Sequence, residues 1–200
     1  MVEVRLADIS DSEGILNIYS PFVLAHATTF ETQVPSIQDI QNRIKQYTEK
    51  YPWLICSVDE KIAGYVYASP FKDREAYQWT CESSIYLDDD FRGKGIAIEL
   101  YAILFRLLRM QGIRSVYAGI TLPNDASVRL HEKFHFRKIA EYENVGYKLG
   151  LWRNVGWWRL QLNEYCLEPP PPIWFSKLDQ NVISTYLQES SRKVGSALTI

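Results

Sequence analysis

A glycine-rich segment, Arg92 to Ala97, is the part of this sequence whose residue types point most directly to chemistry. It follows an alternating apolar run at 81–87, typical of a strand, and precedes apolar residues that recur at helical spacing over 96–107. Gly93 and Gly95 allow a tight turn, so that several backbone N–H groups and the helix dipole converge on one point. This arrangement predicts a binding site for an anion such as a phosphate.

Two familiar nucleotide-binding loops do not fit this segment. A Walker loop needs Ser or Thr after a Gly-Lys pair, whereas Lys94 is followed by Gly95. The dinucleotide-binding fingerprint needs a third glycine where this chain has Ile98. An ordinary strand-to-helix turn is the alternative interpretation. The segment does match Arg/Gln-x-x-Gly-x-Gly/Ala, and in this it resembles the pyrophosphate loop of the GCN5-related N-acetyltransferase (GNAT) superfamily.

A second candidate motif, His131-Glu132-Lys133-Phe134-His135, spells the His-Glu-x-x-His signature of zinc metalloproteases. That chemistry needs one helix that carries both histidines, and a third ligand. The helical pattern gives way to a strand at 136–139, and no helix with a third ligand is recognisable downstream. We therefore expect neither a bound metal nor zinc hydrolysis.

Composition limits the kind of protein and its partners. The 200 residues are 46% hydrophobic and 14% aromatic, which indicates one globular domain with a substantial core. A net charge of −2 without a basic run argues against nucleic acid or an anionic membrane as the main partner. Three scattered cysteines fit a reducing compartment, and Cys81 reads as a small apolar filler. With neither a leader-like start nor a membrane-length apolar run, we expect a cytoplasmic protein.

The elements that must position the loop follow from periodicity. Strands are expected at 2–6, 53–58, 62–68, 81–87, 115–121, 136–147 and 156–162. A first helix is expected after N-cap choices at 8–11, with apolar residues at 15–19 and Pro21 as an interruption or kink, and a second after a capping box of Ser36 and Asp39. Two more helices are expected from Ile96 until Gly112 and from 124 to about 134. Hairpins supply antiparallel pairs and the long helix a parallel crossover. The predicted fold is α/β, with a mixed, mostly antiparallel central sheet and flanking helices.

The end of the chain differs in composition from the rest. Four consecutive prolines, 169–172, interrupt the alternating pattern. We therefore divide the chain into a domain at 1–166 and a Pro-rich segment with a C-terminal appendage at 167–200. Its apolar residues Trp174, Phe175, Ile183 and Leu187 predict docking on the chain itself or on a partner, and the sequence leaves both open.

A narrower resemblance covers residues 3–172. This sequence is similar to the phosphinothricin acetyltransferase group, which includes the methionine sulfoximine and methionine sulfone acetyltransferases. The matching segments are Thr29-Phe30-Glu31-Thr32, Tyr51-Pro52-Trp53-Leu54, Ala63-Gly64-Tyr65-Val66-Tyr67-Ala68, Lys72-x-Arg74-x-Ala76-Tyr77-x-Trp79-Thr80-x-Glu82, Leu122-Pro123-Asn124-Asp125-x-Ser127-Val128-Arg129-Leu130-His131-Glu132 and Asn154-Val155-Gly156-Trp157-Trp158. The resemblance implies the GNAT fold and direct transfer of acetyl from acetyl-CoA to a primary amine.

The resemblance also implies catalytic roles for Glu82 and His131. Glu82 takes the place of the general base, and partial burial in its strand would raise its pKa toward a useful value. A purely structural ion pair with Lys72 or Arg74 is the alternative for Glu82. His131 stands where many superfamily members have the tyrosine that protonates the departing thiolate. The alternative for His131 is a histidine that only orders the bound coenzyme.

Further residues are assigned by the same resemblance. The residues expected to bind acetyl-CoA are Ile85, Tyr86, Leu87, Arg92, Gly93, Lys94, Gly95, Ile96, Ala97, Ile98, Asn124 and Ser127. Among them, the Leu87 N–H is expected to polarise the thioester oxygen where its strand splays from the next. The residues expected to bind the amine are Phe30, Glu31, Thr32, Lys72, Arg74 and Tyr77. Without the resemblance, the same residues would read as a turn and a solvated charged loop.

Two departures from the family pattern stand out. His135 replaces the usual glycine before a strand, and a left-handed turn there would be strained. Asp88, Asp89 and Asp90 precede the phosphate loop, where they either weaken coenzyme binding or face solvent.

The predicted function is therefore an acetyl-CoA-dependent N-acetyltransferase acting on the α-amine of a small amino-acid-like acid. Phosphinothricin, methionine sulfoximine and methionine sulfone represent its substrate class. The alternatives are the same chemistry on another amine, or an acetyl-CoA-binding module without turnover. Apolar surface at Trp157 and Trp158 and on the appendage also predicts a homodimer, as the family implies.

Overall fold

The computed structural model describes residues 1–198 and places seven strands in one sheet of order β1-β2-β3-β4-β5-β7-β6. The strands are β1 Val2–Leu6, β2 Trp53–Val58, β3 Lys61–Pro70, β4 Thr80–Leu87, β5 Ser115–Leu122, β6 Arg137–Lys148 and β7 Leu151–Gln161. The α-helices are α1 Ser12–Ala25, α2 Ile37–Thr48, α3 Ile96–Met110, α4 Asp125–Lys133 and α5 Gln180–Leu198. This architecture confirms the predicted mixed, mostly antiparallel sheet with flanking helices.

The sheet changes character between β4 and β5. All the other neighbouring strands pair antiparallel, whereas β4 and β5 run parallel, joined by the crossover through α3. Their ladder holds only three pairs and ends at Glu82 opposite Tyr117. Beyond that pair the strands separate, while β4 stays paired with β3 and β5 with β7. The sheet is therefore split along one half of its length.

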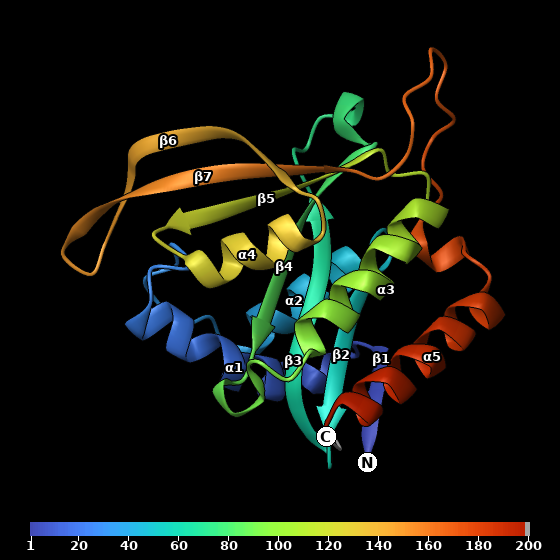
Figure 1. Ribbon diagram of the computed structural model, residues 1–200, viewed down its shortest axis with the longest axis horizontal. Coiled ribbons are helices and arrows are strands. Elements are labelled where there is room, and N and C mark those ends of the chain that lie inside the picture. The colour runs from blue at the N-terminus through green and yellow to red at the C-terminus, as the bar shows by residue number, and fades with distance from the viewer. Residues whose placement is uncertain (199–200) are drawn as a thin grey trace.

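Helices cover both faces of the sheet (Figure 1). On one face, Ile15 and Ile18 of α1 and Ile40 and Ile44 of α2 pack on Trp53 and its neighbours. On the other face, α3 contributes the largest share of a second core that includes Leu100, Leu104 and Leu107. Each helix buries the apolar stripe that its sequence predicts.

Local sequence explains where the helices begin. Asp8 and Asp11 form a capping box before α1, and Ser36 and Asp39 form the predicted one before α2. Pro21 lies inside α1, which continues to Ala25, so the expected interruption does not occur there.

The C-terminal segment docks on its own chain. Phe175, Leu178, Ile183 and Val194 are buried in the same core as α3, and α5 lies beside α3 and β1 (Figure 1). Before it, the Gln111 side chain donates to the Lys50 carbonyl at 2.6 Å and to the Ile173 carbonyl at 2.8 Å. These bonds connect the C-terminal segment to the residues that follow α2 and α3. Of the two docking modes that the sequence left open, the structure shows docking on the chain itself.

The β6-β7 hairpin is longer than predicted. We expected its second strand to begin at 156, but β7 begins at Leu151 and pairs back to Lys148. The sequence pattern is weak there because the end of the hairpin projects beyond the core (Figure 1), and its outer side chains, including Tyr147 and Trp152, are exposed. No helix within residues 1–198 is both long and apolar enough to cross a membrane.

Candidate active site

A cleft of about 700 Å³ opens where β4 and β5 separate. It is lined by Phe22, Ala25, His26, Ala27, Thr28, Ile85, Tyr86, Leu87, Arg92, Gly93, Gly95, Ile96, Ala97, Ile98, Thr121, Leu122, Pro123, Asn124, Ala126, Ser127, Leu130, Leu149 and Arg153. Eleven of the twelve residues predicted to bind acetyl-CoA are in this set, and Lys94 is the exception. The split in the sheet therefore gathers residues from both sides of the phosphate loop around one space.

The end of β4 offers a backbone donor to this cleft. The Asp88 N–H donates to the Ala63 carbonyl at 3.0 Å, toward β3. Because successive N–H groups of a strand point to opposite edges, the Leu87 N–H points toward β5. The β4-β5 ladder has ended by that level. The geometry thus provides the splay that the sequence could not reveal, with Leu87 beside it.

The phosphate loop leads directly into α3. Gly93 and Gly95 have φ values of 76° and 81°, which side chains with a Cβ rarely adopt. The first hydrogen bonds of the helix are from the N–H groups of Ile98 and Glu99 to the Gly95 carbonyl. The preceding N–H groups lie before this ladder at the positive end of the helix dipole, as expected for an anion site.

Ion pairs occupy the charged residues around this loop. Arg92 contacts Asp89 at 2.6 Å, and Lys61 contacts Asp88 at 2.8 Å and Asp90 at 3.1 Å. Lys94 lies over the Phe91 ring, 5.2 Å from its centre, outside the cleft lining. The three aspartates are thus paired with cations, which weakens their repulsion of a bound phosphate.

Asn124 and Ser127 come from the start of α4. The Asn124 side chain accepts a hydrogen bond from the Ser127 N–H at 3.1 Å and so caps the helix. Both residues line the cleft. The capping bond uses the Asn124 Oδ1, which leaves the Nδ2 amide group for a ligand in the cleft.

Glu82 is half-buried at the point where the strands part. It shares a face of β4 with Tyr86, whose ring packs edge-on against Tyr19 and Phe22 of α1. Burial raises the pKa of Glu82 to about 7, and the positive charge of Lys72 opposes that rise. A carboxyl group with this pKa exchanges a proton readily near neutral pH.

His131 is 3% exposed, and both ring nitrogens have partners. Nδ1 lies 2.7 Å from the Ser127 carbonyl and Nε2 lies 2.9 Å from the Tyr101 hydroxyl. A carbonyl only accepts, so Nδ1 carries the proton and Nε2 accepts from Tyr101. Burial lowers the pKa of His131. The geometry therefore holds a neutral imidazole behind the cleft lining rather than on it.

The metalloprotease motif does not have the helix that it needs. Helix α4 ends at Lys133, and His135 follows with a φ of 65°, in the left-handed conformation that is strained for a residue with a side chain. His135 therefore does not continue the helical face of His131. Among residues 1–198, no three His, Cys, Asp or Glu side chains are grouped to hold a metal ion.

Lys72, Arg74 and Tyr77 lie together, but in a second cleft of about 520 Å³. Its other walls include Tyr51 and, from the C-terminal segment, Trp174. Aromatic contacts join this loop to Tyr117, the residue of β5 that lies opposite Glu82. The Phe71 ring stacks on Tyr117 with 4.7 Å between ring centres and contacts Tyr77 edge-on. Lys72 and Arg74 thus line one cleft, and their loop packs against Tyr117.

The remaining predicted substrate residues lie elsewhere. The Phe30 ring packs so closely on Gly146 of the hairpin that a Cβ there would lie 2.2 Å from it. Glu31 forms an ion pair with Arg43 at 2.8 Å, and Thr32 is exposed. Phe30, Glu31 and Thr32 line neither the first cleft nor the second cleft that holds Lys72 and Arg74.

Sequence reasoning missed several residues that line the first cleft. They include Phe22 in the last turn of α1, Thr28 just after that helix, Thr121 of β5, and Leu149 and Arg153 of the hairpin. Thr28 adjoins the matched segment at 29–32, which gave a signal for its neighbourhood. Arg153 likewise adjoins the matched segment at 154–158, but a single arginine in a strand reads by itself as an exposed residue.

Comparisons with known proteins identify the family of this chain. The acetyltransferase (GNAT) domain model matches residues 4–157. The phosphinothricin N-acetyltransferase of Streptomyces viridochromogenes is 35% identical over 170 residues, 85% of this chain and 91% of that protein. The L-methionine sulfoximine/L-methionine sulfone acetyltransferase of Salmonella typhimurium is 30% identical over 167 residues, 82% of this chain and 96% of that protein. The crystal structure of a phosphinothricin acetyltransferase from Sinorhizobium meliloti in complex with AcCoA superposes with a TM-score of 0.82 at 29% identity, covering 88% of this chain and 97% of that chain.

Proposed function

Because this chain belongs to the GNAT acetyltransferase family, we propose that it is an acetyl-CoA-dependent N-acetyltransferase that modifies the α-amine of a small amino-acid-like acid. The relatives named for phosphinothricin, methionine sulfoximine and methionine sulfone define the substrate class. One observation carries the proposal: Glu82 stands where β4 and β5 part, on the strand that leads to the phosphate loop, although Glu82 itself is not among the residues that line the first cleft.

The cleft suits acetyl-CoA in its chemistry. N–H groups of the 93–97 segment and the first turn of α3 would hold the pyrophosphate, and Asn124 and Ser127 would hold the pantetheine arm. Acetyl-CoA supplies a thioester whose C–S bond breaks as the new N–C bond forms. The Leu87 N–H would donate to the thioester oxygen, which gains negative charge in the transition state.

Glu82 is the proposed base. An amino acid arrives as an ammonium, and its proton must leave before nitrogen can attack. A carboxylate with a pKa of about 7 accepts that proton at neutral pH, directly or through a water molecule. Glu82 has the required pKa because the protein buries it, which accounts for its place in the interior of β4.

His131 is proposed to act on the leaving thiolate or to hold α4 in place for the coenzyme. Its neutral ring accepts a hydrogen bond from Tyr101, so a proton would reach the cleft only through that hydroxyl or after a ring movement. The bond from Nδ1–H to the Ser127 carbonyl supports the positioning role, because Ser127 lines the cleft.

Lys72, Arg74 and Tyr77 are the proposed residues for the acidic group of the acceptor. Arginine can hold a carboxylate, phosphinate or sulfone oxygen pair with two parallel hydrogen bonds, and lysine adds a point charge. Their common cleft and the aromatic link to Tyr117 support this assignment. Phe30, Glu31 and Thr32 remain proposed wall residues.

Assembly and location are also proposed. We infer a homodimer, because the hairpin exposes the apolar side chains Tyr142, Val145, Tyr147, Leu151 and Trp152. Tyr147 and Trp152 pair directly across the two strands and share one face, and this hairpin face is suited to self-association. A reducing compartment such as the cytoplasm is supported by the three cysteines, which are all free.

Thiol release from acetyl-CoA tests the function. The protein is assayed with phosphinothricin, methionine sulfoximine and methionine sulfone, with Glu82→Gln as the test variant and the exposed Glu60→Gln as control. We expect rapid release with at least one acid, retained in the control and lost in Glu82→Gln. Release with other amines alone would retain the chemistry and reject the substrate class. Tight acetyl-CoA binding without release on any amine would indicate a binding module.

A further inference from the structure

Arg153 is the charged residue of the first cleft that has no ion-pair partner within residues 1–198. Its Nε atom is buried and has no hydrogen-bond partner among the described residues. We propose that Arg153 binds an anionic group of a ligand in this cleft, either a phosphate of the coenzyme or the carboxylate of the acceptor. The proposal rests on the proposed function for the identity of these ligands.

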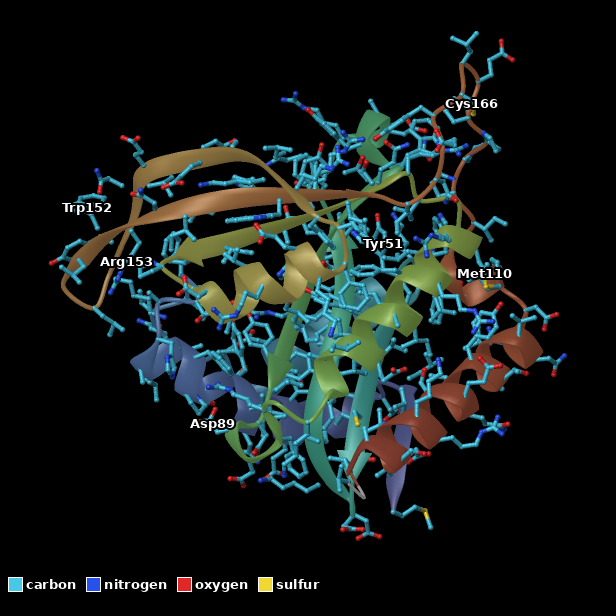
Figure 2. All side chains as sticks on the ribbon, viewed as in Figure 1. Tyr51, Asp89, Met110, Trp152, Arg153 and Cys166 are labelled. Atoms are coloured by element: carbon cyan, nitrogen blue, oxygen red, sulfur yellow. The ribbon has the colours of Figure 1, made fainter. Side chains whose placement is uncertain are left out.

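The backbone directs Arg153 into the cleft. It lies on β7 opposite Gly146 of β6, and its side chain lines the cleft with Leu149 and Thr28. The side chains next to it in β7 do not compete for this space. Trp152 is 63% exposed, and the Asn154 amide donates to Glu141 at 2.7 Å. Figure 2 shows Arg153 between the hairpin and α1, with Trp152 on the outer side.

Charge balance within the cleft favours an anion. Two arginines line it, and Arg92 is already paired with Asp89 at 2.6 Å. No aspartate or glutamate is found among the described lining residues, and no ion pair to Arg153 is present within residues 1–198. A guanidinium that is partly removed from water without a counter-charge is costly, and an arriving anion offsets that cost.

Arginine also restricts the kind of anion. Its planar guanidinium donates two parallel hydrogen bonds, which match the oxygen pairs of phosphates and carboxylates. Both groups are available here, since the coenzyme carries a pyrophosphate and a ribose 3′-phosphate and the acceptor carries a carboxylate. The coenzyme phosphates and the acceptor carboxylate share this chemistry. A substitution of Arg153 distinguishes them, because it weakens the binding of the coenzyme in one case and of the acceptor in the other.

Calorimetric binding separates the sources without relying on turnover. CoA and 3′-dephospho-CoA are titrated into the wild type and Arg153→Gln, and methionine sulfone and its amide are titrated into the CoA-bound proteins. Loss of the contact should weaken the affected ligand by about 10- to 100-fold. Arg153→Lys should restore part of the affinity, because it keeps the charge and loses the paired geometry.

The pattern of losses identifies the bound group. Weaker CoA binding with unchanged dephospho-CoA binding assigns the 3′-phosphate, and equal weakening of both assigns the pyrophosphate. Weaker methionine sulfone binding with unchanged amide binding assigns the carboxylate.

Matched controls keep the proposal falsifiable. Arg129→Gln, an exposed arginine on α4 outside the cleft lining, should leave every affinity unchanged. Thermal melting of Arg153→Gln checks that the variant is folded. Affinities within twofold of the wild type for all four ligands would overturn the proposal. If methionine sulfone does not bind the wild type, the proposed substrate class fails, and the CoA titrations alone decide the role of Arg153.

Discussion

The carboxyl group of Glu82 should set the lower pH limit of the reaction. Its pKa is about 7, so the basic form is lost as pH falls below neutrality. We expect kcat/KM to fall about tenfold per pH unit below pH 7 and to level off above it. In the Glu82→Gln variant this acidic limb of the pH profile should disappear, and kcat should fall by about 100- to 10,000-fold. A wild-type profile that stays flat down to pH 5 would exclude Glu82 as the base.

Lys72 should move that limit. Its positive charge lowers the pKa of Glu82, in opposition to the larger effect of burial. In Lys72→Gln the acidic limb of kcat/KM should therefore shift to higher pH, in addition to any rise in the KM of the acceptor. Lys50→Gln, on the same second cleft, serves as the comparison. If the KM rises and the limb does not move, Lys72 acts on the acceptor alone.

His131 should be visible in the pH dependence of stability. Burial lowers its pKa below the ordinary 6.5, so below that value the unfolded chain takes up a proton that the folded chain does not. The contribution of His131 to the free energy of unfolding is therefore fully present above pH 6.5. It is lost as pH falls below that value, by at most about 1.4 kcal/mol per pH unit. Denaturant unfolding of His131→Asn should lack this loss.

The measurement for His131 is best made in a Glu82→Gln background. Glu82 has a raised pKa and acts with the opposite sign, because its folded form binds the proton more readily. An equal acid-induced loss in the variants with and without His131 would show that other groups cause it.

Among the structural elements, those with strong periodicity could be predicted and those shaped by tertiary contacts could not. The strand before the phosphate loop and helix α3 are marked by alternating and 3.6-residue patterns, and glycines mark the turn between them. The separation of β4 from β5 depends on how the two strands diverge after Glu82, which no local pattern encodes. The exposed first part of β7 and the contribution of Arg153 were missed for the same reason.

Helix α5 stabilises an otherwise open edge of the sheet. The Ser191 hydroxyl accepts a hydrogen bond from the Val4 N–H of the edge strand β1 at 2.8 Å. We expect Ser191→Ala to lower the free energy of unfolding by about 1 kcal/mol, because the Val4 N–H loses its partner. The control is Ser196→Ala, whose hydroxyl donates to the Arg192 carbonyl of its own helix. Equal losses for the two variants in urea unfolding would contradict the edge-covering role.

For the whole molecule, the hairpin face should decide the oligomeric state. Trp152 is 63% exposed on the outer side of β7, among other exposed apolar side chains. A charge at the centre of such a surface would be desolvated on association, so Trp152→Asp should convert the inferred dimer into a monomer. Light scattering after size-exclusion chromatography measures the mass. A monomeric wild type, or a variant that remains dimeric, would reject this face as the interface.

The three thiols divide by location. Burial raises the pKa of Cys56 to about 12 and that of Cys81 well above its usual range, so neither forms a thiolate readily. Cys166 lies exposed on the segment before α5 (Figure 2), with its sulfur 3.3 Å from Arg114. The folded chain thus has one addressable thiol, which would accept a single maleimide dye or spin label. In an assay that detects CoA with a disulfide reagent, it would also give a fixed background of one equivalent per chain.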